Sequence, residues 1–163
     1  MRTSKVWSLI VLMAMAVVPL EAQQQRPLPA FTVTAPGGAA APSQQLSTEQ
    51  RWLLLYVTPG CRSCDQLLAS LKEWHTPQLA ARTVIVVRAN AADAAAYMTS
   101  HLPLEASDIS WYADTSSSAW RALALTGAPV LVGIESGDIK WSISGVLNDP
   151  NALEPVVRSW IER

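Results

Sequence analysis

The chain has 163 residues, a formal net charge of −1, and hydrophobic residues at 50% of its positions. This length suits one domain with a packed core once any targeting segment is set aside. The near-neutral charge argues against nucleic acid or an acidic polymer as a partner.

The first 22 residues have the pattern of a secretory signal. Arg2 and Lys5 give a basic start, residues 6–18 are almost wholly apolar, and Pro19 breaks the run. The run is shorter than the roughly 20 residues of a comfortable membrane span. We expect a signal peptide, with an uncleaved N-terminal membrane anchor as the alternative. Either one places the rest of the chain outside the cytoplasm, in the periplasm or another extracytoplasmic space, where disulfides persist.

Residues 23–48 are rich in Gln, Pro, Ala and Gly. Such a composition cannot pack a core, so we predict a flexible linker. A short strand at 31–34 is the one alternative within it. The folded domain is then expected to cover residues 49–163.

Short apolar or β-branched runs predict the strands of this domain, at residues 52–57, 83–87, 109–113 and 130–134. A hairpin turn at Ser136-Gly137 should join the last of these to a further strand. In that strand Ile139, Trp141 and Ile143 alternate with polar residues, which predicts that the three share one face.

Helical patterns separate the strands. One runs from Cys64 to about His75 and should stop at Pro77. A second follows Asn90, whose side chain is expected to cap it, and a third surrounds Trp120. The third should end at Gly127, and a fourth helix closes the chain. This alternation, with its closing hairpin, predicts an α/β fold with a mixed central sheet and helices on both faces.

The only two cysteines, Cys61 and Cys64, lie where the first strand passes into a helix. The positive end of the helix dipole near Cys61 favours its thiolate, and Arg62 should lower the pKa of Cys61 further. Cys64 begins the apolar stripe of the helix and should face inward. The pair therefore offers one exposed nucleophilic sulfur and one shielded resolving sulfur. A structural metal site and an inert pair are the alternatives, although the second pair of ligands that zinc needs is missing.

Residues 50–163 resemble the thioredoxin family. The resemblance rests on Cys61-Arg62-Ser63-Cys64 between a buried strand and a helix, and on Gly127-Ala128-Pro129-Val130 before the closing hairpin. The secretion signal and Trp120 make the chain similar to the extracytoplasmic branch that includes TlpA- and ResA-like reductases. The resemblance implies a thioredoxin-like fold in which a cis Pro129 faces the cysteines. The backbone of Ala128 would then be free to pair with an extended substrate.

The resemblance also implies an activity, that of an exported thiol–disulfide oxidoreductase, with a reductase favoured over an oxidase. Cys61 would attack a client disulfide and Cys64 would resolve the mixed disulfide, leaving a Cys61–Cys64 disulfide. This sulfur chemistry needs no cofactor and no metal. The implied partners are client proteins with thiols or disulfides and a membrane thiol reductant that renews the dithiol.

Two positions depart from the family pattern. Gly60 stands where thioredoxins have a tryptophan before the first cysteine, and Leu55 where they have a buried acid that helps the second thiol lose its proton. The base for Cys64 is therefore unassigned, with Asp65 its neighbour in sequence. These departures support a second hypothesis, a non-catalytic thioredoxin-like binding or redox-sensing module.

Overall fold

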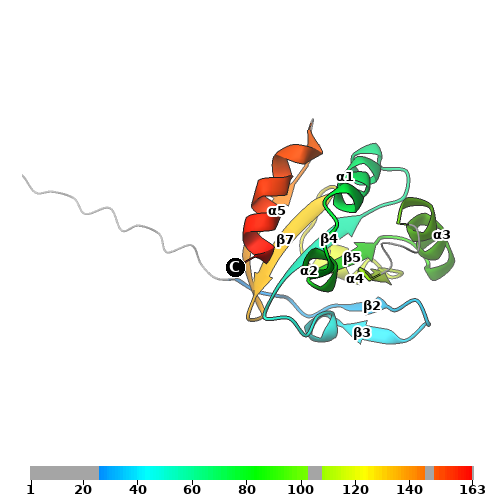
Figure 1. Cartoon of the computed structure of the whole chain (residues 1–163). Helices are drawn as coiled ribbons and strands as arrows, with labels where there is room; N and C mark the ends of the chain where they lie inside the picture. Colours follow the sequence, from blue (N-terminus) through cyan, green and yellow to red (C-terminus); the bar gives the residue numbers. More distant parts are fainter. Residues whose placement is uncertain (1–25, 103–107, 146–148, 163) are drawn as a thin grey trace, which may run out of the picture.

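The computed structural model of this chain describes residues 26–102, 108–145 and 149–162 (Figure 1). The predicted signal or anchor at residues 1–22 lies outside these ranges. In the described part of the chain, no helix is long and apolar enough to cross a membrane.

One mixed sheet organises the molecule, in the strand order β1-β8-β7-β4-β5-β6-β2-β3. Its central strands β4, β5 and β6 are parallel, β7 runs antiparallel to β4, and β8 runs antiparallel to β7. The strands are β1 (Arg26–Pro27), β2 (Thr32–Thr34), β3 (Ala40–Pro42), β4 (Arg51–Val57), β5 (Thr83–Val87), β6 (Ser110–Ala113), β7 (Val130–Glu135) and β8 (Asp138–Ser144).

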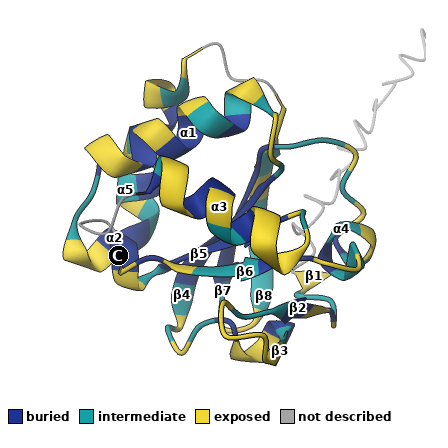
Figure 2. Ribbon diagram, turned by 90° about the vertical axis from the view of Figure 1, so that its right-hand side faces the viewer, coloured by how far each residue is buried: buried dark blue, intermediate teal, exposed yellow. Residues whose placement is uncertain are grey.

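Helices cover both faces of this sheet, which confirms the predicted α/β architecture. They are α1 (Arg62–Glu73), α2 (Pro77–Ala81), α3 (Ala91–His101), α4 (Ser118–Ala122) and α5 (Glu154–Ile161), with 3-10 turns at Ser43–Gln45 and Pro150–Leu153. Side chains of α1, α2, α3 and α5 share one core, and α4 belongs to the other. Figure 2 shows α1, α3 and α5 together above the sheet.

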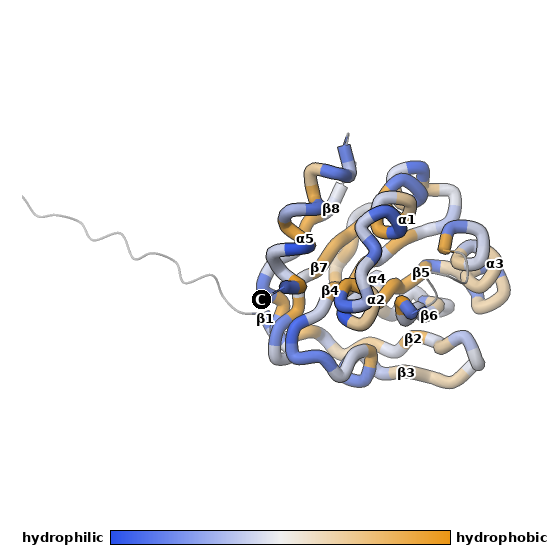
Figure 3. The backbone as a smooth tube through the Cα atoms, viewed as in Figure 1, coloured by the Kyte–Doolittle hydropathy of each residue, from blue (hydrophilic) through white to orange (hydrophobic). Residues whose placement is uncertain are grey.

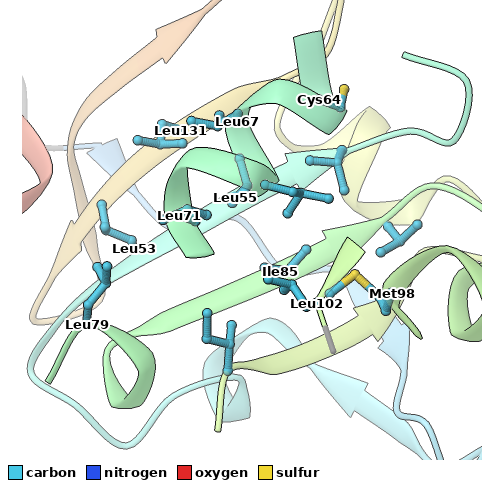
Figure 4. Packing of buried hydrophobic residues seen from close by; sticks show 14 of the residues in the cluster. Leu53, Leu55, Cys64, Leu67, Leu71, Leu79, Ile85, Met98, Leu102 and Leu131 are labelled. Atoms are coloured by element: carbon cyan, nitrogen blue, oxygen red, sulfur yellow. The ribbon is translucent and has the colours of Figure 1, made fainter. Parts of the chain in front are cut away.

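Strand β4 contributes side chains to both cores, because successive side chains of a strand point to opposite faces of the sheet. Leu53 and Leu55 enter the core under α1, and Leu54 and Tyr56 enter the core under α4, each at most 1% exposed. Apolar residues accordingly run along the central strands in Figure 3. Figure 4 shows the first core at close range, with Cys64 beside the leucines of α1. Each fully buried side chain of this kind contributes roughly 1.5–3 kcal/mol.

Residues 26–48 correct the linker prediction. Strand β1 pairs with β8, and β2 pairs with both β3 and β6, so this segment extends the sheet at both edges. Phe31 and Val33 alternate with polar residues and are buried in the core under α4, 5% and 2% exposed. The hydroxyl of Ser43 accepts the N–H of Phe31 and donates to the carbonyl of Pro29, which ties the segment to itself. The burial of Phe31 and Val33 therefore holds this segment on the sheet, although its composition is that of a linker.

Helix α1 ends before Pro77, as predicted. Pro77 also begins the unpredicted helix α2, because it occupies the first turn, where its missing N–H costs nothing, while Thr76 caps that helix. Two local predictions were wrong. Helix α4 ends before Gly127, at Ala122, and Ala124 takes the left-handed conformation with φ 53°. A register shift opposite Gly133 and Ile134 places Ile139 against one core, with Trp141 and Ile143 against the other.

Candidate functional site

The two cysteines form a disulfide at the start of α1, with their Cα atoms 5.2 Å apart. Cys61 is the residue that caps α1, and its sulfur accepts the N–H of Cys64 at 3.2 Å. Cys61 is half-buried, whereas Cys64 has no exposed surface and belongs to the core under α1. The pair thus has one reachable sulfur and one enclosed sulfur.

A tight turn carries the chain from β4 to Cys61. Gly60 has φ 77°, a left-handed conformation that glycine adopts without a steric penalty, and the N–H of Cys61 donates to the carbonyl of Thr58 at 3.3 Å. This backbone conformation gives a physical reason for a glycine at the position where thioredoxins carry a tryptophan.

The segment before β7 lies against this disulfide. The carbonyl oxygen of Ala128 is 3.6 Å from the sulfur of Cys61, and the peptide bond between Ala128 and Pro129 is cis. Pro129 is buried, and its carbonyl accepts the N–H of Gly145 at 3.3 Å. Among the described residues, the N–H of Ala128 has no hydrogen-bond acceptor. The structure therefore brings Cys61, Cys64, Ala128 and Pro129 together.

No protein-family profile matches the sequence, and no match is found among curated protein sequences. Solved structures do match. A secreted Mycobacterium tuberculosis disulfide oxidoreductase, homologous to Escherichia coli DsbE, shares 17% identity at a TM-score of 0.64, covering 79% of this chain and 95% of its own. A thiol:disulfide interchange protein of the thioredoxin family from Chlorobium tepidum shares 18% identity at a TM-score of 0.58, covering 85% of this chain and 97% of its own.

The thioredoxin domain of a thiol-disulfide oxidoreductase from Bacteroides vulgatus shares 13% identity at a TM-score of 0.62, covering 84% of this chain and 96% of its own. Each of these matches covers nearly the whole of the neighbour. The chain has a thioredoxin-like fold. This confirms the fold that the two sequence motifs imply.

Within this thioredoxin-like fold, the surroundings of Cys64 are apolar. Leu55, at the position of the usual acid, is 1% exposed and belongs to the same core as Cys64, together with Leu67 and Leu131. Arg62 is exposed, and it forms no ion pair with any described residue. The site therefore combines a cation at its surface with an uncharged environment around its inner sulfur.

The side chain of Asp65 is bound to α3. Its carboxylate accepts the hydroxyl of Tyr97 at 2.7 Å and lies 3.2 Å from Nε2 of His101. Burial raises the pKa of Tyr97, and the hydrogen bond to Asp65 raises it further. Tyr97 and His101 are not predictable from the sequence as partners of this acid, since no residue pattern aligns α3 with the first turn of α1.

A second polar cluster lies in the other core. The hydroxyl of Tyr56 donates to the carboxylate of Asp114 at 2.7 Å, and that carboxylate also accepts the N–H groups of Ala119 and Trp120 at 3.3 and 3.0 Å. Asp114 thus bonds the start of α4. Burial and the bond to Asp114 raise the pKa of Tyr56.

The described residues contain no group of three or more His, Cys, Asp or Glu side chains that could hold a metal ion. His75 lies in the loop between α1 and α2, whereas His101 is the last residue of α3 and is engaged with Asp65. The chemistry that this site offers is that of its two sulfur atoms.

Proposed function

We propose that this protein is a thiol–disulfide oxidoreductase that exchanges disulfides with client proteins. The observation that carries the proposal is the pairing of a reachable sulfur on Cys61 with a fully enclosed sulfur on Cys64, beside the Ala128–Pro129 segment. The solved structures that share its fold include proteins described as disulfide oxidoreductases, which supports the same activity.

In the reducing direction, the thiolate of Cys61 attacks one sulfur of a client disulfide. The client S–S bond breaks, one client sulfur leaves as a thiolate and takes up a proton, and a mixed disulfide with Cys61 remains. Cys64 then loses its proton and attacks the sulfur of Cys61, which releases the second client thiol. Two electrons pass to the client, and the protein is left with the Cys61–Cys64 disulfide.

The local structure supports Cys61 as the attacking group. Its sulfur lies at the N-terminus of α1, where the partial positive charge of the helix stabilises an anion, and it accepts the N–H of Cys64. The exposed guanidinium of Arg62 adds a weaker, solvent-screened attraction. Cys64 is enclosed by apolar side chains, which disfavours its thiolate until a mixed disulfide forms next to it.

Client binding is assigned to Ala128 and Pro129. The unpaired N–H of Ala128 lies in the same segment as the carbonyl that touches the sulfur of Cys61. An extended client segment can pair with this backbone as an added strand, which would align its cysteine with Cys61. Pro129, having no N–H, cannot compete for that pairing.

The proposal includes export and a preference for the reducing direction. The basic and apolar pattern of residues 1–22 supports export, as does the description of the Mycobacterium tuberculosis neighbour as secreted. The similarity of the sequence motifs to those of TlpA- and ResA-like reductases supports the reducing direction. A membrane thiol reductant would then renew the dithiol.

The direct test is the reduction of insulin disulfides by the protein, with an added dithiol that regenerates its reduced form. We expect turnover by the native chain and none by Cys61→Ser. The Cys64→Ser variant should retain client proteins as mixed disulfides that dithiothreitol releases. Absence of both turnover and trapped clients would overturn the proposal.

Leu55 favours one second candidate, a non-catalytic binding module, since the acid that assists the inner thiol is missing. That candidate predicts that Cys64→Ser traps nothing, and that replacing both cysteines with serine leaves partner binding unchanged. Trapped mixed disulfides would exclude it.

A further inference from the structure

We propose that a groove on the face of the sheet away from α1 binds the client chain next to its reacting cysteine, and that it selects client segments carrying an acidic side chain. This inference rests on the proposed function and names the class of substrate for the same site.

The groove has a volume of about 330 Å³ and lies between the loop after α4 and strands β7 and β8. At one end it is lined by Thr126 and Val130, the residues on either side of the Gly127–Pro129 segment. Ala128, whose carbonyl oxygen lies 3.6 Å from the sulfur of Cys61, is two residues along the chain from both Thr126 and Val130.

The floor of the groove is apolar. Leu123, Val130 and Val132 line it at 5%, 3% and 2% exposure, and half-buried Ile139 continues it. In the described residues these side chains belong to the core under α4, a helix of five residues. An apolar client side chain can therefore be buried here.

The far end of the groove is cationic. Arg26 and Lys140 line it there, and β1 places Arg26 opposite Ile139 on β8. The β7–β8 register runs from Val130 at the disulfide end to Ile134, the partner of Ile139. Four residues of extended chain cover about 13 Å. An extended client would therefore reach these cations about four residues from its reacting cysteine.

The charge at this end is net positive. Lys140 lies 3.3 Å from Asp138, whereas Arg26 is exposed and has no ion-pair partner among the described residues. A client carboxylate would complete the set of opposite charges, and a client ammonium group would be repelled. Charge complementarity thus assigns the groove to acidic, partly apolar client segments.

The test uses the full chain and two disulfide-bonded peptides that differ at two positions. One peptide carries Asp four residues before and four residues after its cysteine, and the other carries Lys at both places. We expect the native protein to reduce the acidic peptide about tenfold faster at low salt, with the preference shrinking as salt is added. Arg26→Glu and Lys140→Glu should each reduce or reverse the preference.

Lys72→Glu is the matched control, since it makes the same charge change on α1, across the sheet. It should keep the native preference. Equal rates for the two peptides with the native protein, or an equal loss of preference in Lys72→Glu, would overturn the proposal. The proposal would also be overturned if Arg26→Glu and Lys140→Glu changed the free energy of unfolding but not the peptide rates. The two cations would then stabilise the fold and not bind the client.

Hydroxyethyl disulfide, which has no peptide to enter the groove, separates this proposal from the proposed function. If the native protein reduces it but does not discriminate between the peptides, the groove assignment alone fails. If the native protein reduces neither the peptides nor hydroxyethyl disulfide, the oxidoreductase itself fails.

Discussion

The hydroxyl of Tyr56 donates a 2.7 Å hydrogen bond to Asp114, and both side chains are almost fully enclosed, at 0% and 1% exposure. The same carboxylate accepts two N–H groups at the start of α4. One buried acid therefore joins β4, the end of β6 and α4. Since β4 leads directly to the cysteines, this cluster helps to fix the strand that positions the redox site.

Replacing Asp114 with alanine should destabilise the fold by about 3 kcal/mol, because two buried donors and one partly buried donor lose their acceptor, and each buried unsatisfied group costs roughly 1–3 kcal/mol. Urea unfolding measures the change. Ser116→Ala, an exposed substitution in the same loop, should stay within about 0.5 kcal/mol of the native protein. Equal stability of the two variants would contradict the role given to Asp114.

Tyrosine ionisation should limit stability at high pH. Burial raises the pKa of Tyr56 and of Tyr97 above the ordinary value of about 10, and the bonds to Asp114 and Asp65 raise both further. The folded state therefore holds these protons more tightly than the unfolded chain does. Their contribution is complete below about pH 10 and is lost as the pH rises above it.

Absorbance of tyrosinate against pH tests this expectation. The native protein should show tyrosines that ionise only well above pH 10, together with the loss of structure. Tyr97→Phe should remove one of them and flatten the fall in stability on the alkaline side. If the number of tyrosines that ionise well above pH 10 were the same in Tyr97→Phe as in the native protein, Tyr97 would be shown to ionise like an exposed residue.

Gly133 allows the indole ring of Trp141 to lie directly on β7. A Cβ atom at this position would overlap the ring, so Gly133→Ala should force Trp141 to move, at a cost of about 1–3 kcal/mol. The matched control is Gly37→Ala, where a Cβ meets nothing within 4 Å and φ is not left-handed. Thermal unfolding of the two variants gives the comparison, and a Gly133→Ala protein as stable as Gly37→Ala would contradict this packing.

Arg62→Gln should slow the reaction of Cys61 with an alkylating reagent at neutral pH. The guanidinium is exposed, so we expect only about a two- to fivefold effect, fading as salt is added. Lys72→Gln removes a positive charge near the other end of the same helix and should leave the rate unchanged. A larger effect at Lys72 would mean that the total charge, and not the neighbour of Cys61, sets its reactivity.

Local patterns predicted a strand, a helix cap and a hairpin turn of the domain. The β-branched run gave β5 with its observed bounds, Thr83–Val87, and Asn90 caps α3 through the N–H of Asp93 as expected. Ser136 and Gly137 both take positive φ in the predicted hairpin turn. Each of these signals depends on residues close together in the chain.

What the sequence did not predict depends on contacts between distant residues. The strands of residues 26–48 exist because Phe31 and Val33 find a core built by β4, β5 and β7. The register shift on β8 moves Ile139 to the face opposite Trp141, against a strict alternation. Likewise, the partners of Asp65 lie on α3, more than thirty residues away in the chain, and no spacing rule connects them.

The most direct measurement is the alkylation of the fully reduced protein at neutral pH, with each modified cysteine located by peptide mass. We predict that Cys61 is modified first, and that Cys64 reacts only when the protein is unfolded. Preferential modification of Cys64, or a Cys61 that reacts no faster in the folded protein than in the unfolded chain, would contradict an activated, reachable sulfur at the start of α1.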